Sequence, residues 1–432
     1  MPKERGAQNN RWSWRSENPG GATGISLGRP ALILAAGVLV AALILTAGYV
    51  LLVRQPYLFG VIGNDGVHLQ EEQEAGVRAK VVEFSWREFY PSEGEKDRAY
   101  IDSKKEELAE LRGAGFEIIL SLGYHDTPPW VHENYQDTYY VNQQGEEWTG
   151  DTFLSDGTPI DNGDANLVFN GELRSLVGSY LRDVFSEFGD DFYAVRLGGG
   201  RYGELTYPQA DFGGESNLYW AYDTNAQRSA REAGISDWRP GDSSPDGEAG
   251  AFLEWYLDYL TKYQDWQISA LRESYDGRIM MLYPSWGIRP GQVEEAVAAN
   301  LDGSTPAERN GEIQRGLDFE RQVGTIEDSN VLVTTAWLDA DASGDSDEDP
   351  RYWSPVHYLS SLVEGHPQDP EMYGENTGRG EASEMELSAS RMREYGLAGM
   401  AWYNEDQLFS DRYANLEDYE RVIETSRKQD DR

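Results

Sequence analysis

The chain has 432 residues, no cysteine, and a formal net charge of −39 at pH 7, from 37 basic and 76 acidic side chains. The absence of cysteine excludes disulfides and thiolate metal sites, and five scattered histidines argue against a histidine-based zinc site, so we expect no metal and no cofactor. The negative charge argues against nucleic acid as a partner, because phosphate binding needs the opposite sign.

An apolar run near the N-terminus predicts a membrane anchor. Residues 31–53, "ALILAAGVLVAALILTAGYVLLV", carry no charge and are long enough to cross a bilayer as a helix. Basic residues precede the run and only Arg54 follows it closely, so the N-terminus is expected to be cytoplasmic and the remainder extracellular at the cell membrane. A cleaved signal peptide is the alternative, although its apolar region is normally shorter. The predicted parts are a disordered cytoplasmic tail (1–30), a single-pass transmembrane anchor (31–53) and one barrel domain (55–432).

After the anchor, short apolar runs alternate with helical patterns. The runs span 57–63, 78–84, 116–122, 192–198, 278–284, 330–337, 370–375 and 397–403. The clearest helical patterns lie at 102–115, 173–189, 252–275 and 385–396. This alternation predicts an α/β fold with a parallel sheet, and eight runs favour a closed (β/α)₈ TIM barrel over an open sheet. The long gaps after the third, fourth and fifth runs predict elaborated loops at the C-terminal face, where barrel enzymes place their sites.

The fourth run continues into "RLGGGRYGELTYP", residues 196–208. This is not a phosphate-binding loop, because no Lys-Ser/Thr pair follows and a carboxylate stands where phosphate charge would lie. Glycines at this density indicate a tight backbone that presents Glu204 at the strand end. Glu375 ends the seventh run, across the predicted barrel mouth. Two carboxyls in this arrangement suit glycosidic cleavage, one as acid and one as nucleophile or base.

Alternatives remain for the second carboxylate. With 76 acidic residues in the chain, Glu375 is equally well explained as a solvated surface group. Glu405, after the eighth run, is its main rival.

Three stretches resemble known barrel glycosidases. "GGGRYGELTYP" looks like the acid-bearing segment of β-amylases, and 399–423 resembles their eighth-strand region. Residues 81–131 resemble the region from the second to the third strand of β-galactosidase barrels of the family 42 type. The resemblance spans residues 57–423 and implies that Glu204 is the general acid, or the acid/base of a retaining enzyme, and that Glu375 is the nucleophile or general base.

The chain also departs from these families. Gly203 precedes the acid where related retaining barrels usually have asparagine, and "GYHDTPPWV" replaces the glycine-cysteine loop of β-amylases. The resemblance therefore implies a glycoside hydrolase with a carbohydrate substrate, and a retaining, β-galactosidase-like enzyme is favoured. The alternatives are an inverting, β-amylase-like α-glucan hydrolase and a catalytically inactive barrel that binds glycans at the cell surface. Oligomeric state stays open.

Aromatic and polar side chains near the strand ends are candidate substrate contacts. Indole and phenol faces can stack on sugar C–H faces, while packing over the barrel mouth is the plainer explanation for each. The candidates are Trp86, His125, Trp130, Tyr202, Tyr207, Trp286, Trp337, Trp402, Asn404 and Glu405, with Glu83 and Asp126 as further polar contacts. The acidic stretch 339–350 partly imitates a calcium loop but has Pro350 at the twelfth position, so we interpret it as a solvated loop.

Overall fold

The computed structural model describes residues 57–430, except positions 65, 151, 154–158, 161–163, 236, 305–310, 379 and 411. The chain divides into two units, 1–55 and 56–432, and every described residue belongs to the second. The tail and the membrane anchor predicted at 31–53 lie outside the described residues. Within the described part, no helix combines the length and the apolar character needed to cross a bilayer.

Eight parallel strands close into a barrel. They are β1 (Leu58–Ile62), β2 (Ala79–Glu83), β3 (Glu117–Ser121), β6 (Ala194–Leu197), β7 (Arg278–Tyr283), β8 (Val331–Thr335), β9 (Met372–Glu375) and β10 (Gly399–Tyr403). The hydrogen-bonded order is β1-β10-β9-β8-β7-β6-β3-β2, and β1 pairs with β2 to complete the ring. Each strand falls within one predicted apolar run, so the prediction of a closed α/β barrel is confirmed.

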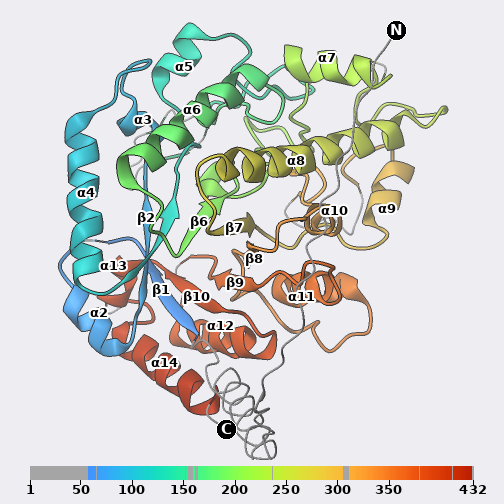
Figure 1. The fold of residues 1–432 in the computed structure, drawn as a ribbon. Coiled ribbons are helices and arrows are strands. Elements are labelled where there is room, and N and C mark those ends of the chain that lie inside the picture. Colours follow the sequence, from blue (N-terminus) through green and yellow to red (C-terminus); the bar gives the residue numbers. More distant parts are fainter. Residues whose placement is uncertain are drawn as a thin grey trace, which may run out of the picture. The chain divides into compact units, whose positions relative to one another are not determined.

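Helices surround the barrel (Figure 1). The longer ones are α4 (Arg98–Gly113), α6 (Gly171–Phe188), α7 (Thr224–Glu232), α8 (Glu248–Arg272), α11 (Pro355–Val363), α12 (Ala382–Glu394) and α14 (Leu416–Asp430). The shorter ones are α2 (Leu69–Ala75), α3 (Trp86–Phe89), α5 (Pro129–Asn134), α9 (Gln292–Ala298), α10 (Phe319–Gly324), α13 (Glu405–Leu408), and the 3₁₀ turns η1 (Arg201–Gly203) and η2 (Pro350–Tyr352).

Side-chain caps explain why two helices start earlier than the apolar pattern predicts. The Asp97 carboxylate accepts hydrogen bonds from the amides of Ala99 and Tyr100, so α4 begins four residues before its predicted start at 102. Asn170 caps α6 in the same way. Caps satisfy amides that have no intrahelical partner, and they lie outside the periodic apolar face.

Strand alternation separates two cores. Side chains that point into the barrel form one cluster: Ala79, Val81, Ile119, Ala194, Met280, Leu282, Leu332, Tyr373 and Ala401. Their neighbours, such as Val82, Leu120 and Val195, point outward into the larger cluster beneath the helices. The inward face of each strand therefore leads, at its carboxyl end, to the barrel mouth.

The predicted long loops are confirmed. The connection from β3 to β6 carries α5, α6 and a small antiparallel pair, β4 (Thr152–Phe153) with β5 (Pro159–Ile160). The connection from β6 to β7 carries η1, α7 and α8, and that from β7 to β8 carries α9 and α10.

Candidate active site

Polar and aromatic side chains follow the apolar interior on the inward face of the strands. Side chains alternate between the two faces of a strand, so the residue two positions after an inward-pointing residue also points inward, and here it lies at the mouth. They are Glu83 on β2, Ser121 on β3, Arg196 on β6, Glu375 on β9 and Tyr403 on β10. This end of the barrel is therefore polar and charged, in contrast to the apolar layer below it.

Glu375 is the most deeply placed carboxylate of the mouth, with 5 % of its surface exposed. Its Oε2 accepts a hydrogen bond from Arg196 Nη2 at 2.8 Å, while its Oε1 has no hydrogen-bond partner among the described residues. Burial raises the pKa of Glu375, the Arg196 guanidinium opposes that rise, and the charge of Glu83 adds to it. A buried carboxylate with one unpaired oxygen costs stability, and groups of this kind concentrate at functional sites.

The glycine-rich segment after β6 folds back on itself. The Gly200 amide donates to the Glu204 carbonyl at 2.8 Å, and the Gly203 amide donates to the Gly200 carbonyl at 2.9 Å. A Cβ on Gly198 would lie 2.1 Å from the Gly203 carbonyl oxygen, so no larger residue fits there without backbone movement. The Leu205 amide then donates to the carbonyl of Leu282 on β7. Glu204 is thereby held at the rim, where β6 and β7 end.

Helix α8 fastens this segment from outside the barrel. The buried amide of Gln267 accepts from the Gly198 amide at 3.1 Å and donates to the Gly198 carbonyl at 3.2 Å. Tyr124 donates its hydroxyl to the same Gln267 oxygen. Both backbone groups of Gly198 are therefore satisfied by one side chain, which fixes the point where the chain leaves β6.

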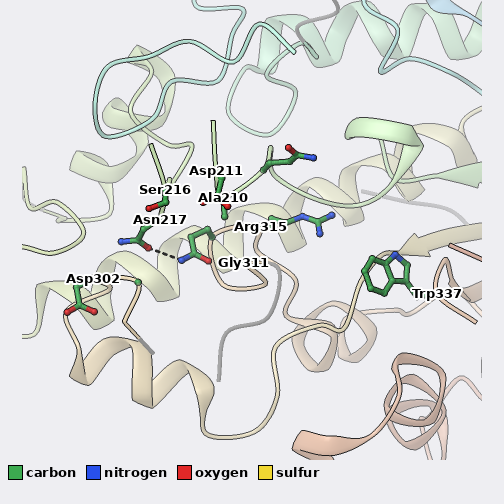
Figure 2. A pocket seen from close by; sticks show the side chains of 11 residues that line it. Ala210, Asp211, Ser216, Asn217, Asp302, Gly311, Arg315 and Trp337 are labelled. Atoms are coloured by element: carbon green, nitrogen blue, oxygen red, sulfur yellow. Dashed lines mark hydrogen bonds between the residues drawn. The ribbon is translucent and has the colours of Figure 1, made fainter. Parts of the chain in front are cut away.

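Glu204 itself is partly accessible, with 16 % of its side chain exposed. Arg315 Nη2 lies 3.8 Å from its Oε2. Arg315 is in turn tied to the segment after Glu204, because its Nε donates to the Thr206 hydroxyl at 3.2 Å and its carbonyl accepts from the Tyr207 amide at 3.0 Å. Arg315 is also one of the residues that line a groove of about 670 Å³, seen in Figure 2.

His125 and Glu83 lie beside these groups. His125 Nε2 is 3.3 Å from a carboxylate oxygen of Glu83, whose side chain is 59 % exposed. A Cβ on Gly203 would come within 3.7 Å of the His125 ring, so the loop after β3 meets the glycine-rich segment next to Glu204. Asp126 points elsewhere, into an ion pair with Arg87 at 2.9 Å.

The predicted aromatic contacts divide by accessibility. Trp86, Tyr207 and Trp402 are fully buried, and Trp130 is almost so. Trp86 packs edge-on against Trp130, and Tyr207 stacks on Tyr256 at 4.1 Å, so these rings belong to the large core cluster beneath the helices. Trp286 and Trp337 are half-buried, and Tyr202, next to Glu204, is 63 % exposed. Of the predicted rings, these last three have surface that a ligand can reach.

The structure separates Glu405 from the mouth. Glu405 is buried and its Oε1 accepts from Lys80 Nζ at 2.8 Å. Lys80 also contacts Glu72 at 2.6 Å, and it points outward from β2, between the inward-facing Ala79 and Val81. Two carboxylates therefore share one buried ammonium outside the barrel wall, and burial raises the pKa of Glu72 to about 7. Asn404, half-buried, precedes Glu405 at the start of α13.

The residues of the acidic stretch after β8 are engaged with protein groups. Asp339 accepts from the amide and hydroxyl of Thr377, and Asp341 accepts from Ser343. Within the described ranges, no cluster of three or more His, Cys, Asp or Glu residues is placed to hold a metal ion.

Several residues of the site were missed by sequence reasoning. Arg196 was visible as a charge in the inward register of an otherwise apolar strand, and Tyr403 (43 % exposed) as the inward neighbour of Trp402. Asn376 follows Glu375, and its side chain exchanges hydrogen bonds with the amide and carbonyl of Tyr403. Arg315 gave no local signal, because its contact with Glu204 joins loops 111 residues apart in sequence.

Comparisons with known proteins support the resemblance seen in the sequence. Residues 68–151 match the model of the family 42 β-galactosidases. The barrel resembles those of β-galactosidases and β-amylases. No curated protein sequence matches the chain significantly.

Solved structures show the same fold at low identity. The catalytic domain of β-amylase from Paenibacillus polymyxa superposes with a TM-score of 0.63 and 16 % identity, covering 85 % of this chain and 98 % of that domain. The β-galactosidases from Marinomonas ef1 and from the haloarchaeon Halorubrum lacusprofundi each give a TM-score of 0.53 and 12 % identity over 86 % of this chain. The match spans 59 % and 58 % of those two proteins.

The close approach at Gly198 generates a stability prediction. Gly198→Ala forces its Cβ against the Gly203 carbonyl, and we expect a loss of about 3 kcal/mol or more in the free energy of unfolding. Gly178→Ala is the matched control, because Gly178 lies in the middle of α6 and a Cβ there would be 3.6 Å from the nearest atom, Arg182 Nη1. The free energy of unfolding of this variant should stay within about 1 kcal/mol of the wild-type value. Urea unfolding measures both. Equal stability of the two variants would contradict the tight strand end.

Proposed function

We propose that this protein is a retaining glycoside hydrolase, similar to β-galactosidases, in which Glu204 is the acid/base and Glu375 the nucleophile. The observation that carries the proposal is the state of Glu375: buried at the mouth, paired with Arg196 through one oxygen and unpaired at the other. The match to the family 42 β-galactosidases supports a glycosidase. Glu405 is the weaker candidate for nucleophile, since its carboxylate pairs with Lys80 outside the barrel wall.

The two carboxyls have environments that suit different tasks. Arg196 favours the ionised form of Glu375, which would attack the anomeric carbon through its unpaired oxygen. Glu204 would give its proton to the glycosidic oxygen as that bond breaks, and the leaving group departs as an alcohol. Glu204, now ionised, would take a proton from water, whose oxygen attacks the anomeric carbon and releases Glu375 from the ester.

The β-amylase-like alternative is an inverting α-glucan hydrolase. It draws support from the superposition that covers 98 % of a β-amylase catalytic domain. In that mechanism Glu375 acts as general base on a water and no covalent intermediate forms. NMR of the first anomer released separates the two, because retention keeps the configuration and inversion reverses it.

The carboxylate pair is tested by isosteric substitution. We expect Glu204→Gln to lower kcat/KM on an alkyl glycoside about 10²- to 10⁴-fold, and Glu375→Gln to lower it about a thousandfold or more. Glu371→Gln is the matched control, because Glu371 pairs with Arg278 before β9 begins and should leave activity unchanged. The measurement is hydrolysis of a panel of aryl and alkyl glycosides and α-glucans.

Three results would count against the assignment. Full activity in Glu375→Gln with loss in Glu405→Gln would transfer the nucleophile to Glu405. A wild-type protein that binds glycans but hydrolyses none of the panel would favour an inactive binding barrel. Mass spectrometry after treatment with a 2-deoxy-2-fluoro glycoside should find the label on Glu375, and no label combined with an inverted product would favour the β-amylase-like mechanism.

The pair of Arg196 and Glu375 predicts a shift in the pH profile. Arg196 lowers the pKa of Glu375, so Arg196→Met raises it, and the acidic limb of kcat/KM should move to higher pH by about 1–2 units. Activity at low pH then falls more than activity at neutral pH. Arg278→Met removes an arginine at the opposite end of the barrel, where it pairs with Glu371, and should leave the acidic limb in place. If the acidic limb of kcat/KM does not move in Arg196→Met, the assignment of Glu375 as the carboxyl that must be ionised for activity is contradicted.

We infer from the sequence that the enzyme is a single-pass protein of the cell membrane with its barrel outside. The apolar run 31–53 and the basic residues before it support this location. The full chain, expressed in bacterial cells, should stay in the membrane fraction through washes with high salt and carbonate, and protease added to spheroplasts should cleave the barrel. Release of the barrel into the medium as a shortened chain would instead favour a cleaved signal peptide.

A further inference from the structure

The barrel closes where its first strand meets its second and its last. β1 pairs with β2 on one side and with β10 on the other. Helices α2 and α13 lie on the side of the barrel where β1 lies (Figure 1). Three buried side chains join these elements, and we call them the seam cluster: Glu72 of α2, Lys80 of β2 and Glu405 of α13.

The seam cluster holds one ammonium and two carboxyls away from water. The side chains of Lys80 and Glu72 have no exposed surface, and that of Glu405 is 4 % exposed. Lys80 Nζ lies 2.6 Å from the Glu72 carboxyl and 2.8 Å from Glu405 Oε1, and it donates to the carbonyl of Gly63, after β1, at 3.5 Å. An ammonium has three hydrogens to donate, so these three contacts use it fully.

The charges of the seam cluster balance only when one carboxyl is protonated. If both were ionised, one ammonium would face two carboxylates, and the excess buried charge would be costly. Burial raises the pKa of Glu72 to about 7; Lys80 opposes that rise, and the charge of Glu405 and a hydrogen bond to it add to the rise. A hydrogen bond between two carboxyls requires a proton on one of them. The cluster therefore has a place for a proton between Glu72 and Glu405.

The strands beside the cluster bring apolar neighbours. Val61 of β1 and Ile118 of β3 are the register partners of Lys80, and Trp402 of β10 is the register partner of Val61. All three side chains are buried. The ring of Phe116 lies 5.8 Å from Lys80 Nζ. These strand positions supply no charge that could replace the proton.

The helices beside the cluster bring other charged or titratable groups. Burial and the charge of Glu72 raise the pKa of Tyr419, on α14, well above its usual range, so the phenol stays neutral where Glu72 titrates. Arg78 and Arg427 donate to backbone carbonyls at the C-terminal end of α2, at 2.9 and 3.1 Å. Their guanidinium groups therefore hold the helix end, while Lys80 holds the carboxyls.

We propose that Glu72 and Glu405 share one proton over Lys80, and that this proton acts as a latch that fastens α2 and α13 to the seam of the barrel. As the pH rises the proton passes to solvent, the two carboxylates repel each other, and α13 loosens. Because α13 begins two residues after Tyr403, the latch makes the rim of the mouth respond to pH. The latch is independent of the roles proposed for Glu204 and Glu375.

The direction of the effect follows from proton binding. The usual pKa of a glutamate is 4.5, so between pH 4.5 and about 7 the folded protein keeps a proton that the unfolded chain has lost. The stability that this proton contributes is fully present below pH 4.5 and is lost as the pH rises to about 7 and beyond.

The test removes one carboxyl of the pair. Glu72→Gln leaves one carboxylate for one ammonium, so its stability should not depend on the shared proton. Urea unfolding of the full chain in a non-ionic detergent gives the unfolding constants at pH 5 and pH 8. Over this interval the wild-type constant should rise about tenfold or more relative to that of the variant, since groups outside the cluster titrate alike in both proteins. Glu405→Gln should give the same result.

Two controls separate the pair from other charges. Glu424→Gln removes a carboxyl that pairs with Lys428 at 2.7 Å on the surface of α14, and it should keep the wild-type pH dependence. Histidines can change charge between pH 5 and 8. His68, before α2, stacks on Phe409 at 3.6 Å and lies 3.6 Å from Glu71, so His68→Phe keeps a ring there and should also keep the wild-type pH dependence.

Hydrogen exchange locates the effect. The amides of Gln407 and Ser410 donate to the carbonyls of Asn404 and Gln407, so their protection reports on α13. After correction for the intrinsic rates, protection in the wild type should fall several-fold between pH 6 and pH 8, and in Glu72→Gln it should stay constant.

Four results would overturn the latch. They are an equal pH dependence of stability in wild type and in both single variants, an equal loss of stability at pH 5 and pH 8 in Glu72→Gln, and unchanged protection of α13 in the wild type. The fourth is failure of both single variants to fold, because either remaining carboxylate neutralises Lys80. The double variant Glu72→Gln/Glu405→Gln, which leaves Lys80 without a carboxylate, should unfold at lower urea than either single variant.

Discussion

The ion pair between Arg196 and Glu375 crosses the interior of the barrel mouth, and the candidate site is built around it. It joins the fourth and seventh strands of the barrel, β6 and β9, at 2.8 Å and in a largely buried setting. Burial raises the pKa of Glu375 and the Arg196 guanidinium opposes that rise, while a buried guanidinium without a partner would cost stability. Only one Glu375 oxygen is hydrogen-bonded, so the contact that opposes the rise of the Glu375 pKa leaves the other oxygen without a hydrogen-bond partner among the described residues. Closure of the barrel makes this possible, because β6 and β9 are not neighbours in the sheet.

The position of Glu204, the other carboxyl of the candidate pair, is set by backbone geometry. Gly198 and Gly200 allow a tight turn, because a side chain at either position would collide with the backbone of residues 203–206. Gln267 of α8 stabilises this turn by hydrogen bonds to both backbone groups of Gly198. Glu204 consequently stands at the rim, partly accessible and beside Arg315, while Glu375 lies buried below. Two carboxyls in contrasting surroundings are what acid and nucleophile roles require. Arg315 lies 3.8 Å from Glu204 and is bonded to the segment that follows it, so it helps to fix the position of this carboxyl.

Sequence reasoning succeeded where the signal was periodic and local. All eight strands lie within predicted runs, and the glycine spacing around Glu204 correctly indicated a tight strand end. Sequence reasoning was less successful in predicting toward which face of a strand or helix an individual side chain points. Trp402 was predicted as a substrate contact and Tyr403 was missed, but alternation from the inward Ala401 turns Trp402 toward the helices and Tyr403 toward the mouth. Trp86 was chosen for its place after a strand, yet it lies on α3 and packs against Trp130 in the core.

The sequence by itself determined the barrel, the long loops at its C-terminal face, and the candidacy of Glu204 and Glu375, because hydrophobic period, glycine density and strand ends are all properties of short segments. Only the tertiary structure decided that Glu375 pairs with Arg196, that Glu405 is held outside the wall by Lys80, and that Arg315 lies beside Glu204. Each of these contacts joins residues more than a hundred positions apart. Their distances follow from how the barrel closes and how its loops pack, and no local pattern encodes that.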